Sequence, residues 1–254
     1  IKTLTLDDFA LTPGPTLLSE SLSNHQKGWI TVVGSGATGI QFIFEIDDYL
    51  KKEGRPWKLR LVDSGQRPLG LFPAAMGNYV RARLEERGIE YIPNHYFLQQ
   101  KEDEVVIENR ASYARQTLPS DLTLYFSGKS TQTCLKTNWY GQVKTDGKTL
   151  KSIFSAGDCA RFGSPGSNSL TAQSAVRKGK LVAQNILKQG RLLGFMNPYL
   201  HRDLGYVISM GAEDAIGWVG TPKNIIAGAP ALSIKDIVES QYDLLLAGTD
   251  TFAL

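Results

Sequence analysis

Hydrophobic and polar positions in the first part of the chain follow the order strand, glycine-rich turn, helix, strand. Trp29 to Val33 is an apolar run of strand length that leads into the sequence GSGATG at 34–39. From Thr38 onward, apolar residues recur at helical spacing on two faces, which predicts a helix covered on both sides. The next strand-length run, Lys58 to Val62, predicts a second strand that ends at Asp63.

The same reading continues through the middle of the chain. A helix is predicted over Ala74 to Arg87, because apolar residues recur on one face and Gly88 follows as a C-terminal cap. A third strand is predicted at Ile89 to Ile92. An inserted antiparallel meander follows, with short strands at His95 to Gln100, Glu104 to Ile107 and Ser112 to Thr117. The chain then returns to the main sheet with a strand at Asp121 to Phe126. The pattern predicts an α/β fold with a parallel sheet and an inserted β-meander.

The turn at 34–39 matches G-x-G-x-x-G, and its place between a strand and a helix gives each glycine a physical role. Gly34 permits the tight turn, Gly36 lets the backbone approach a pyrophosphate, and Gly39 lets the helix pack close to the sheet. The helix start, which includes Thr38, supplies free N–H groups and a partial positive charge for phosphates. The motif predicts a dinucleotide site, with a glycine turn that binds nothing as the alternative.

Asp63 bears on which dinucleotide is bound, because it stands at the end of the second predicted strand. A carboxylate there accepts hydrogen bonds from both hydroxyls of an adenine ribose and repels a 2′-phosphate. Arg67 lies nearby and could accommodate such a phosphate. Taken together, the two residues favour NADH over NADPH.

A second informative stretch begins with a predicted strand over Ser152 to Ala156 and continues through Gly157 and Asp158. The helix that follows is predicted to pack through a face of small and apolar residues, namely Ala172, Ala175, Val176, Gly179, Val182 and Ile186. Small residues permit close approach to something flat. The composition leaves both an ordinary β-turn-α unit and a cofactor site open.

Composition is that of a globular protein, with 42% hydrophobic and 21% charged residues among 254. The net charge of +3 is spread over alternating signs, which disfavours a nucleic-acid surface. Cys134 and Cys159 are the two cysteines and form no C-x-x-C motif, so a reducing compartment is favoured over secretion. His25, His95 and His201 lack ligand spacing, and we predict no metal.

The ends of the chain bear on its location and completeness. No apolar run is long enough to span a bilayer, and the first residues lack the apolar core of a signal peptide. The chain starts at an isoleucine rather than a methionine. We therefore expect a piece of a longer protein or a processed product.

Several motifs in this order resemble one enzyme family. They are GSGATG at 34–39, Asp63, LTLYFSG at 122–128, IFSAGDCA at 153–160, TAQ at 171–173, DLGY at 203–206 and GWV at 217–219. Together they resemble the flavin-dependent pyridine nucleotide oxidoreductases, and among them the type II NADH:quinone oxidoreductases. The resemblance covers most of the chain from Trp29 to about Val219.

The resemblance implies a role for the later motifs. Gly157 and Asp158 would lie at the flavin of a bound FAD, with Asp158 hydrogen-bonded to the ribityl chain. Ala172 and Gln173 would border the isoalloxazine ring and the quinone pocket, and Gly128 would approach the nicotinamide. Because the family carries its FAD fingerprint upstream of the NADH domain, the turn at 34–39 is identified as the NADH site.

Three departures from the family accompany this resemblance. The upstream FAD fingerprint is absent, so the chain alone would lack the turn that holds the flavin's pyrophosphate. Gln41 stands where many relatives have a glutamate near the nicotinamide, and Arg177 stands where the quinone motif usually has a second glutamine. Gln41 and Gln173 are the candidate catalytic residues.

The predicted organisation is a lead-in segment over residues 1–28, a Rossmann-like NADH-binding domain over 29–135, and the C-terminal part of an FAD-binding domain with a tail over 136–254. The predicted function is FAD-dependent transfer of hydride from NADH and of electrons to a quinone, in the cytoplasm or on the inner face of a membrane. A different acceptor and a non-catalytic NADH-binding module stay open. Peripheral membrane contact and a homodimer are further alternatives.

Overall fold

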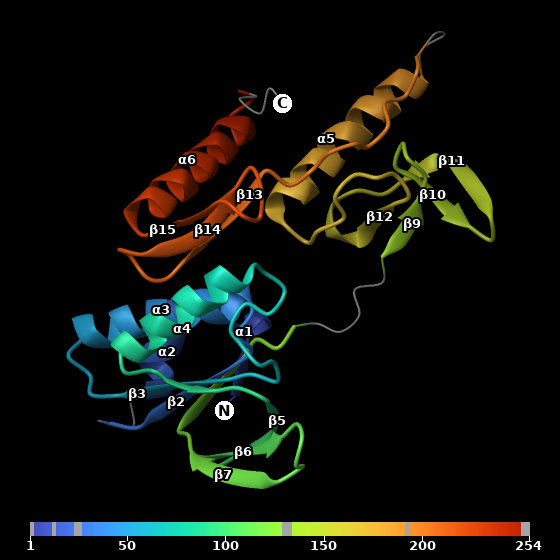
Figure 1. Ribbon diagram of the computed structural model, residues 1–254. Coiled ribbons are helices and arrows are strands. Elements are labelled where there is room, and N and C mark those ends of the chain that lie inside the picture. Colours follow the sequence, from blue (N-terminus) through green and yellow to red (C-terminus); the bar gives the residue numbers. More distant parts are fainter. Residues whose placement is uncertain (1–2, 12–13, 23–26, 129–133, 191–193, 250–254) are drawn as a thin grey trace. The chain divides into compact units, whose positions relative to one another are not determined.

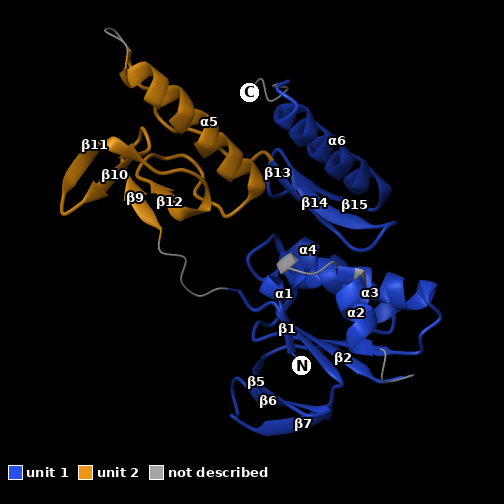
Figure 2. Ribbon diagram, turned by 180° about the vertical axis from the view of Figure 1, so that it is seen from behind, with its two compact units in different colours: residues 1–128, 205–254 blue, residues 129–204 orange. Residues whose placement is uncertain are grey.

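The structure is a computed structural model that describes residues 3–11, 14–22, 27–128, 134–190 and 194–249 (Figure 1). Its chain divides into two compact units, residues 1–128 with 205–254 and residues 129–204 (Figure 2). The sequence-based assignment placed 136–254 in one part, whereas the units divide this stretch between residues 204 and 205. The domain boundaries at residues 28 and 135 follow from the motifs and stay a prediction.

A five-stranded parallel sheet, ordered β1-β8-β2-β3-β4, forms the centre of the first unit. Its strands are β1 (Thr3–Thr5), β2 (Trp29–Val33), β3 (Lys58–Val62), β4 (Glu90–Ile92) and β8 (Leu122–Tyr125). The predicted α/β fold with a parallel sheet is confirmed. The segment expected as a lead-in also supplies β1, which pairs with β8 at the edge of the sheet.

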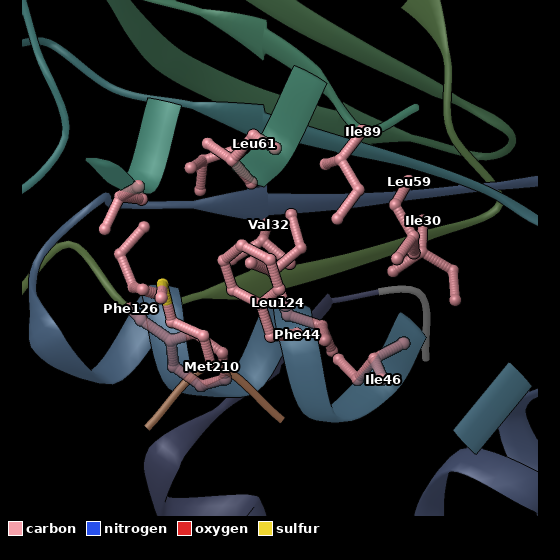
Figure 3. Packing of buried hydrophobic residues seen from close by; sticks show 14 of the residues in the cluster. Ile30, Val32, Phe44, Ile46, Leu59, Leu61, Ile89, Leu124, Phe126 and Met210 are labelled. Atoms are coloured by element: carbon pink, nitrogen blue, oxygen red, sulfur yellow. The ribbon is translucent and has the colours of Figure 1, made fainter. Parts of the chain in front are cut away.

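Helices cover this sheet and enclose the core. They are α1 (Leu6–Leu11), α2 (Gly14–Leu22), α3 (Ala37–Lys52) and α4 (Ala74–Glu86). Side chains of α3 such as Phe44 meet those of β2 and β3 such as Val32 and Leu61 in the cluster of Figure 3. Gly88 follows α4 with φ of +71°, as expected for a glycine that ends a helix.

The predicted meander is an antiparallel sheet of its own. It consists of β5 (His95–Lys101), β6 (Glu104–Asn109) and β7 (Arg115–Pro119). The last strand begins three residues later than predicted, because Asn109 Oδ1 accepts the N–H groups of Ala111 and Ser112 in a turn. Val105 and Ile107 of β6 pack on Val62, which anchors the meander at the end of β3.

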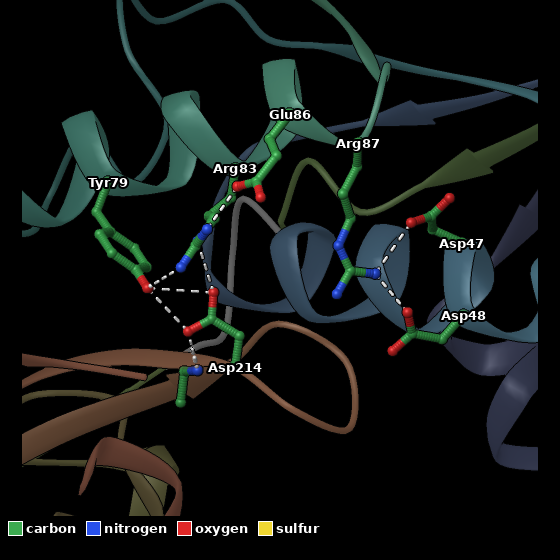
Figure 4. A network of polar contacts seen from close by, with 8 residues as sticks. Asp47, Asp48, Tyr79, Arg83, Glu86, Arg87 and Asp214 are labelled. Carbon is green, nitrogen blue, oxygen red and sulfur yellow. Dashed lines mark hydrogen bonds and ion pairs between the residues drawn. The ribbon is translucent and has the colours of Figure 1, made fainter. Parts of the chain in front are cut away.

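The C-terminal segment of the first unit adds a second layer on its helices. It forms the antiparallel strands β13 (Gly205–Ser209), β14 (Ala215–Val219) and β15 (Ile225–Ala227), followed by α6 (Ala229–Leu246). Asp214, in the loop between β13 and β14, accepts from Tyr79 at 3.0 Å and pairs with Arg83 at 3.0 Å (Figure 4). These contacts hold the three-stranded sheet on α4.

The second unit is a four-stranded sheet followed by one long helix. Its elements are β9 (Leu135–Thr137), β10 (Gln142–Thr145), β11 (Lys148–Phe154), the 3₁₀ turn η1 (Gly157–Cys159), β12 (Ala160–Phe162) and α5 (Ala172–Gln189). Asn185 is buried on α5 and donates to the carbonyls of Tyr140 and Asn197. These bonds tie the end of α5 to the loops around it.

Candidate functional site

The first turn of the candidate site follows β2 and has a conformation that requires glycine. Gly34 has φ of +104°, and its N–H donates to the carbonyl of Val62 at 2.9 Å. A Cβ at this position would stand 2.7 Å from the carbonyl oxygen of Phe126. The turn is therefore pressed between the ends of β3 and β8, where ligands bind in open α/β sheets.

Gly36 and Gly39 differ in what surrounds them, as their expected roles require. No heavy atom lies within 4 Å of a Cβ built on Gly36, whereas a Cβ on Gly39 would stand 1.8 Å from the Gly34 carbonyl oxygen. Gly36 caps α3 without a side-chain hydrogen bond, and Thr38 lies in the first helical turn. The start of α3 thus combines N–H groups that have no side-chain cap with open space at Gly36, which suits a pyrophosphate.

Asp63 closes the turn from the end of β3. Its Oδ2 accepts the N–H of Ser35 and its Oδ1 accepts the N–H of Gly65, both at 2.6 Å. Each carboxylate oxygen has a second lone pair and can still accept from a hydroxyl group. The carboxylate therefore braces the glycine turn and keeps lone pairs that can accept hydrogen bonds from hydroxyl groups.

Arg67, the alternative phosphate ligand, is occupied by its own loop. Its guanidinium donates to the carbonyls of Leu69 and Gly70 at 3.1 Å and of Phe72 at 2.7 Å. Burial raises the pKa of Tyr91 to about 12, and the charge of Asp63 adds to this shift. The negative charge of Asp63 beside the turn makes it a poor site for a 2′-phosphate.

Gln41 and Gly128 complete the predicted residues of the first unit. The Gln41 side-chain amide donates to Ser209 Oγ at 3.2 Å, which links α3 to the end of β13. Gly128 follows β8 with φ of +86° and has open space where a Cβ would stand. It lies beyond the same sheet edge as Gly34, because Phe126 donates to the carbonyl of Val33 at 2.8 Å.

The second group of predicted residues lies in the second unit, around η1. Gly157 has φ of +69° and open space at its missing Cβ. Asp158 Oδ1 is buried and has no hydrogen-bond partner among the described residues. A buried carboxylate oxygen normally has a donor, so this orphaned acceptor fits a ligand hydroxyl such as those of a ribityl chain.

Lys178 of α5 lies beneath this turn and is 1% exposed. Its ammonium donates to the carbonyl of Ala160 at 3.0 Å, and the carbonyl of Gly157 lies 3.5 Å away. Burial lowers the pKa of Lys178, and the nearby Asp158 carboxylate opposes that shift. The lysine ammonium therefore contacts backbone carbonyls at both ends of the turn that carries Asp158.

The start of α5 differs from the prediction in the packing of Ala172, whereas the predicted role of Gln173 stays a prediction. Thr171 caps the helix by accepting the N–H of Ser174 at 3.1 Å. Ala172 is exposed and Gln173 is half-buried. The fully buried positions of α5 are Ser174, Lys178, Val182 and Asn185, so the packed face is rotated from the predicted small-residue face, of which Val182 alone is fully buried.

Sequence reasoning missed Lys178 and Ser35, which the structure places directly at the two turns. Lys178 lies four residues from both Ser174 and Val182, and that spacing could have placed it on the buried face. The backbone bond from Ser35 to Asp63 carries no side-chain signal. His25 lies outside the described residues, and within the described part of the chain no group of three potential metal ligands occurs.

None of the helices in the described ranges is both long enough and apolar enough to cross a membrane. The two groups of site residues belong to different compact units, with Gly34 to Asp63 and Gly128 in the first and Gly157 to Gln173 in the second. Each unit thus contains one of the two groups of predicted site residues.

Comparison with solved structures agrees with this fold. NDH2 from Plasmodium falciparum in complex with NADH superposes with a TM-score of 0.72 at 14% identity, covering 92% of this chain and 65% of that one. The sulfide:quinone oxidoreductase of Aquifex aeolicus superposes with a TM-score of 0.67 at 17% identity, covering 92% and 62%. At these identities the likeness concerns the fold.

Sequence comparison gives relatives with a stated activity. The type II NADH:quinone oxidoreductase of Staphylococcus aureus strain NCTC 8325 is 26% identical over 240 residues, which cover 86% of this chain and 58% of the relative. The corresponding protein of strain MSSA476 is 25% identical over 239 residues. This chain therefore spans a little over half the length of these relatives, as the missing FAD fingerprint suggests.

A sequence model of one family matches residues 15–179, a range that runs from α2 across the glycine turn and Asp63 to the Asp158 turn and the first half of α5. The match covers well over half of the chain and includes both groups of site residues. The chain belongs to the pyridine nucleotide-disulphide oxidoreductase family.

Proposed function

We propose that this chain supplies the NADH site and part of the flavin site of an FAD-dependent NADH dehydrogenase that reduces a quinone. The observation that carries the proposal is the turn at Gly34 to Gly39, where open space at Gly36 meets uncapped helix N–H groups and the fixed acceptor Asp63. The named activity of the Staphylococcus aureus relatives supports the same reaction.

The first unit binds and orients NADH in this proposal. The backbone at Gly36 and the first turn of α3, with Thr38, hold the pyrophosphate, because no side chain obstructs them. Asp63 accepts from the adenine ribose hydroxyls and disfavours NADPH. Gly128 leaves room for the nicotinamide, and the Gln41 amide, held by Ser209 at 3.2 Å, orients it without adding charge.

The second unit positions the flavin side. Asp158 Oδ1 would accept from a ribityl hydroxyl, and Lys178 fixes the backbone of that turn. Ala172 and Gln173 would border the ring. The bound FAD supplies the redox chemistry, as an acceptor of hydride from NADH and a donor of electrons to the quinone.

The acceptor and the location are the finer parts of the proposal. Gln173 borders the quinone, and Arg177 replaces a glutamine of the family's quinone motif. Because quinones are apolar and membrane-dissolved, we place the reaction at the inner face of a membrane, with the protein on the cytoplasmic side. Acceptor preference, measured with quinone, oxygen and ferredoxin, tests this part separately.

Gly36→Ala tests the NADH site without removing a packing contact. An added Cβ meets no heavy atom within 4 Å of this position, and alanine in place of glycine as N-cap costs less than about 1 kcal/mol. We expect the variant to keep the unfolding midpoint of the wild type and to lose at least tenfold in NADH affinity, measured by fluorescence titration. Equal affinity of both proteins would overturn the assignment of this turn.

The visible spectrum of the purified chain, recorded after incubation with FAD and removal of the unbound flavin, tests the flavin half. A yellow protein that bleaches when NADH is added without oxygen would show that hydride passes between the two sites. A chain that binds NADH and stays colourless would show that the flavin half-site needs the part of the relatives that this chain does not span.

A further inference from the structure

Cys134 and Cys159 occupy opposite positions in the second unit, although 24 residues separate them. Strands β9 and β12 pair in parallel, with Leu135 opposite Ala160 (Figure 1). Each cysteine directly precedes one of these paired residues. The two cysteines therefore lie at the same end of the paired strands, Cys134 just before β9 and Cys159 at the end of the turn η1.

The side-chain contacts place both thiols around the same turn. The Cys134 thiol donates to the carbonyl of Asp158 at 3.4 Å, and the Cys159 thiol donates to the carbonyl of Ala156 at 3.1 Å. Because Asp158 directly precedes Cys159, the first contact places the Cys134 sulfur beside the peptide group that leads into Cys159.

The backbone spacing suits a covalent link between them. The paired residues that directly follow the two cysteines, Leu135 and Ala160, lie on neighbouring strands about 4.8 Å apart, and disulfides join Cα atoms about 4.4–6.8 Å apart. Both cysteines are exposed, so an oxidant in solution reaches them. Gly157, with φ of +69° and no neighbour at its missing Cβ, allows the turn to adjust when the Cys159 thiol leaves the Ala156 carbonyl.

We propose that Cys134 and Cys159 are a dithiol pair that closes to an intramolecular disulfide on exposure to a peroxide. In the first step one thiol is oxidised by hydrogen peroxide to a sulfenic acid, and the peroxide is reduced to water. In the second step the other thiol attacks the sulfenic sulfur, the S–S bond forms, and the sulfenic oxygen leaves as water. A dithiol reductant reverses the reaction.

The disulfide joins the start of β9 to the turn that carries Asp158. Such a bond limits how far the turn can open, so the disulfide reversibly restricts the conformation of the Gly157–Cys159 segment. It requires neither NADH nor FAD, so its failure and the failure of the proposed function give different results. The sequence suggested no pairing because no C-x-x-C spacing is present.

Peptide mapping of the whole chain provides the test. The reduced protein is treated with hydrogen peroxide, its remaining thiols are blocked with N-ethylmaleimide, and it is digested with trypsin without reductant. The sequence gives the peptides 130–136 and 152–161, each with one cysteine. We expect these two peptides linked, lighter by two hydrogen atoms, in protein that stays monomeric, and we expect dithiothreitol to release them.

Cys134→Ser and Cys159→Ser are the matched controls. Each should give no linked peptide, and the remaining thiol should accumulate as a sulfenic acid that dimedone traps. The proposal is wrong if peroxide leaves both wild-type thiols free, if it oxidises them singly without a link, or if it links them only between two chains. These readings come from the wild type and do not depend on how well the variants fold.

Discussion

Gly39→Ala should weaken the first unit by an amount that follows from one contact. A Cβ at Gly39 would stand 1.8 Å from the Gly34 carbonyl oxygen, whereas ordinary contacts begin at 3.4 Å. The start of α3 must therefore retreat by about 1.6 Å. Because Ile40, Ile43 and Phe44 follow on this helix and are fully buried, the retreat disturbs the core and costs about 1–3 kcal/mol.

Hydrogen exchange followed by mass spectrometry measures the amide exchange rates of α3 and α5 separately, and so shows whether α3 is destabilised. A loss of about 1–3 kcal/mol corresponds to roughly five- to 150-fold faster exchange where amides open by unfolding. Gly179→Ala in α5 is the control, because no heavy atom lies within 4 Å of its Cβ. Alanine is preferred over glycine inside a helix by about 0.5–1 kcal/mol, so exchange in α5 should slow.

The two substitutions are thus expected to act in opposite directions, although both add one methyl group to a helical glycine. Unchanged exchange in α3 of Gly39→Ala would refute the argument that close approach of α3 to the Gly34 turn requires glycine. Slower exchange in both variants would show that helix propensity outweighs the backbone contact.

Two further predictions follow from the titratable groups. Asp63→Asn should lower the unfolding free energy by about 1.5–3 kcal/mol, because a side-chain amide cannot accept hydrogen bonds from both the Ser35 and Gly65 N–H groups. In paired titrations its NADH affinity should fall more than its NADPH affinity. The control Asp103→Asn, at an exposed position, should change neither stability nor affinity. Burial lowers the pKa of His201 in the folded protein, Arg177 adds to this shift, and Asp203 opposes it. The folded protein therefore favours the neutral imidazole. The contribution of His201 to the unfolding free energy is fully present above pH 6.5 and is lost as the pH falls through the lowered pKa of the folded state. Urea midpoints should decline across that window in the wild type, and His201→Gln should flatten the decline.

The parts of the fold that the sequence predicted are those set by local constraints. In GSGATG at 34–39, the glycines at 34 and 39 are required by the backbone itself. Gly34 has a positive φ, and a Cβ on Gly39 would collide with the Gly34 carbonyl oxygen. The strands and helices from residue 29 to 126 follow the spacing of apolar residues. Their order then fixes which ends of the strands meet at the candidate site.

The parts that escaped prediction depend on pairing between distant segments. β1 has three residues, too few for a periodic signal, and its partner β8 lies far along the chain. Asp214 contacts Tyr79 and Arg83 across more than 130 residues of sequence. Cys134 lies beside the Asp158–Cys159 segment because β9 and β12 pair, which no spacing rule indicates.

Lys178 and Asp158 show why a local rule fails at the candidate flavin site. A lysine with one per cent exposure breaks the expectation that small residues pack there, yet two carbonyls hold its ammonium. Asp158 Oδ1 is buried without a donor among the described residues, an arrangement that costs free energy in an isolated turn. Because folded chains keep such costs mainly where a ligand offsets them, the orphaned oxygen on the turn that Lys178 contacts supports the proposal that a ligand binds there.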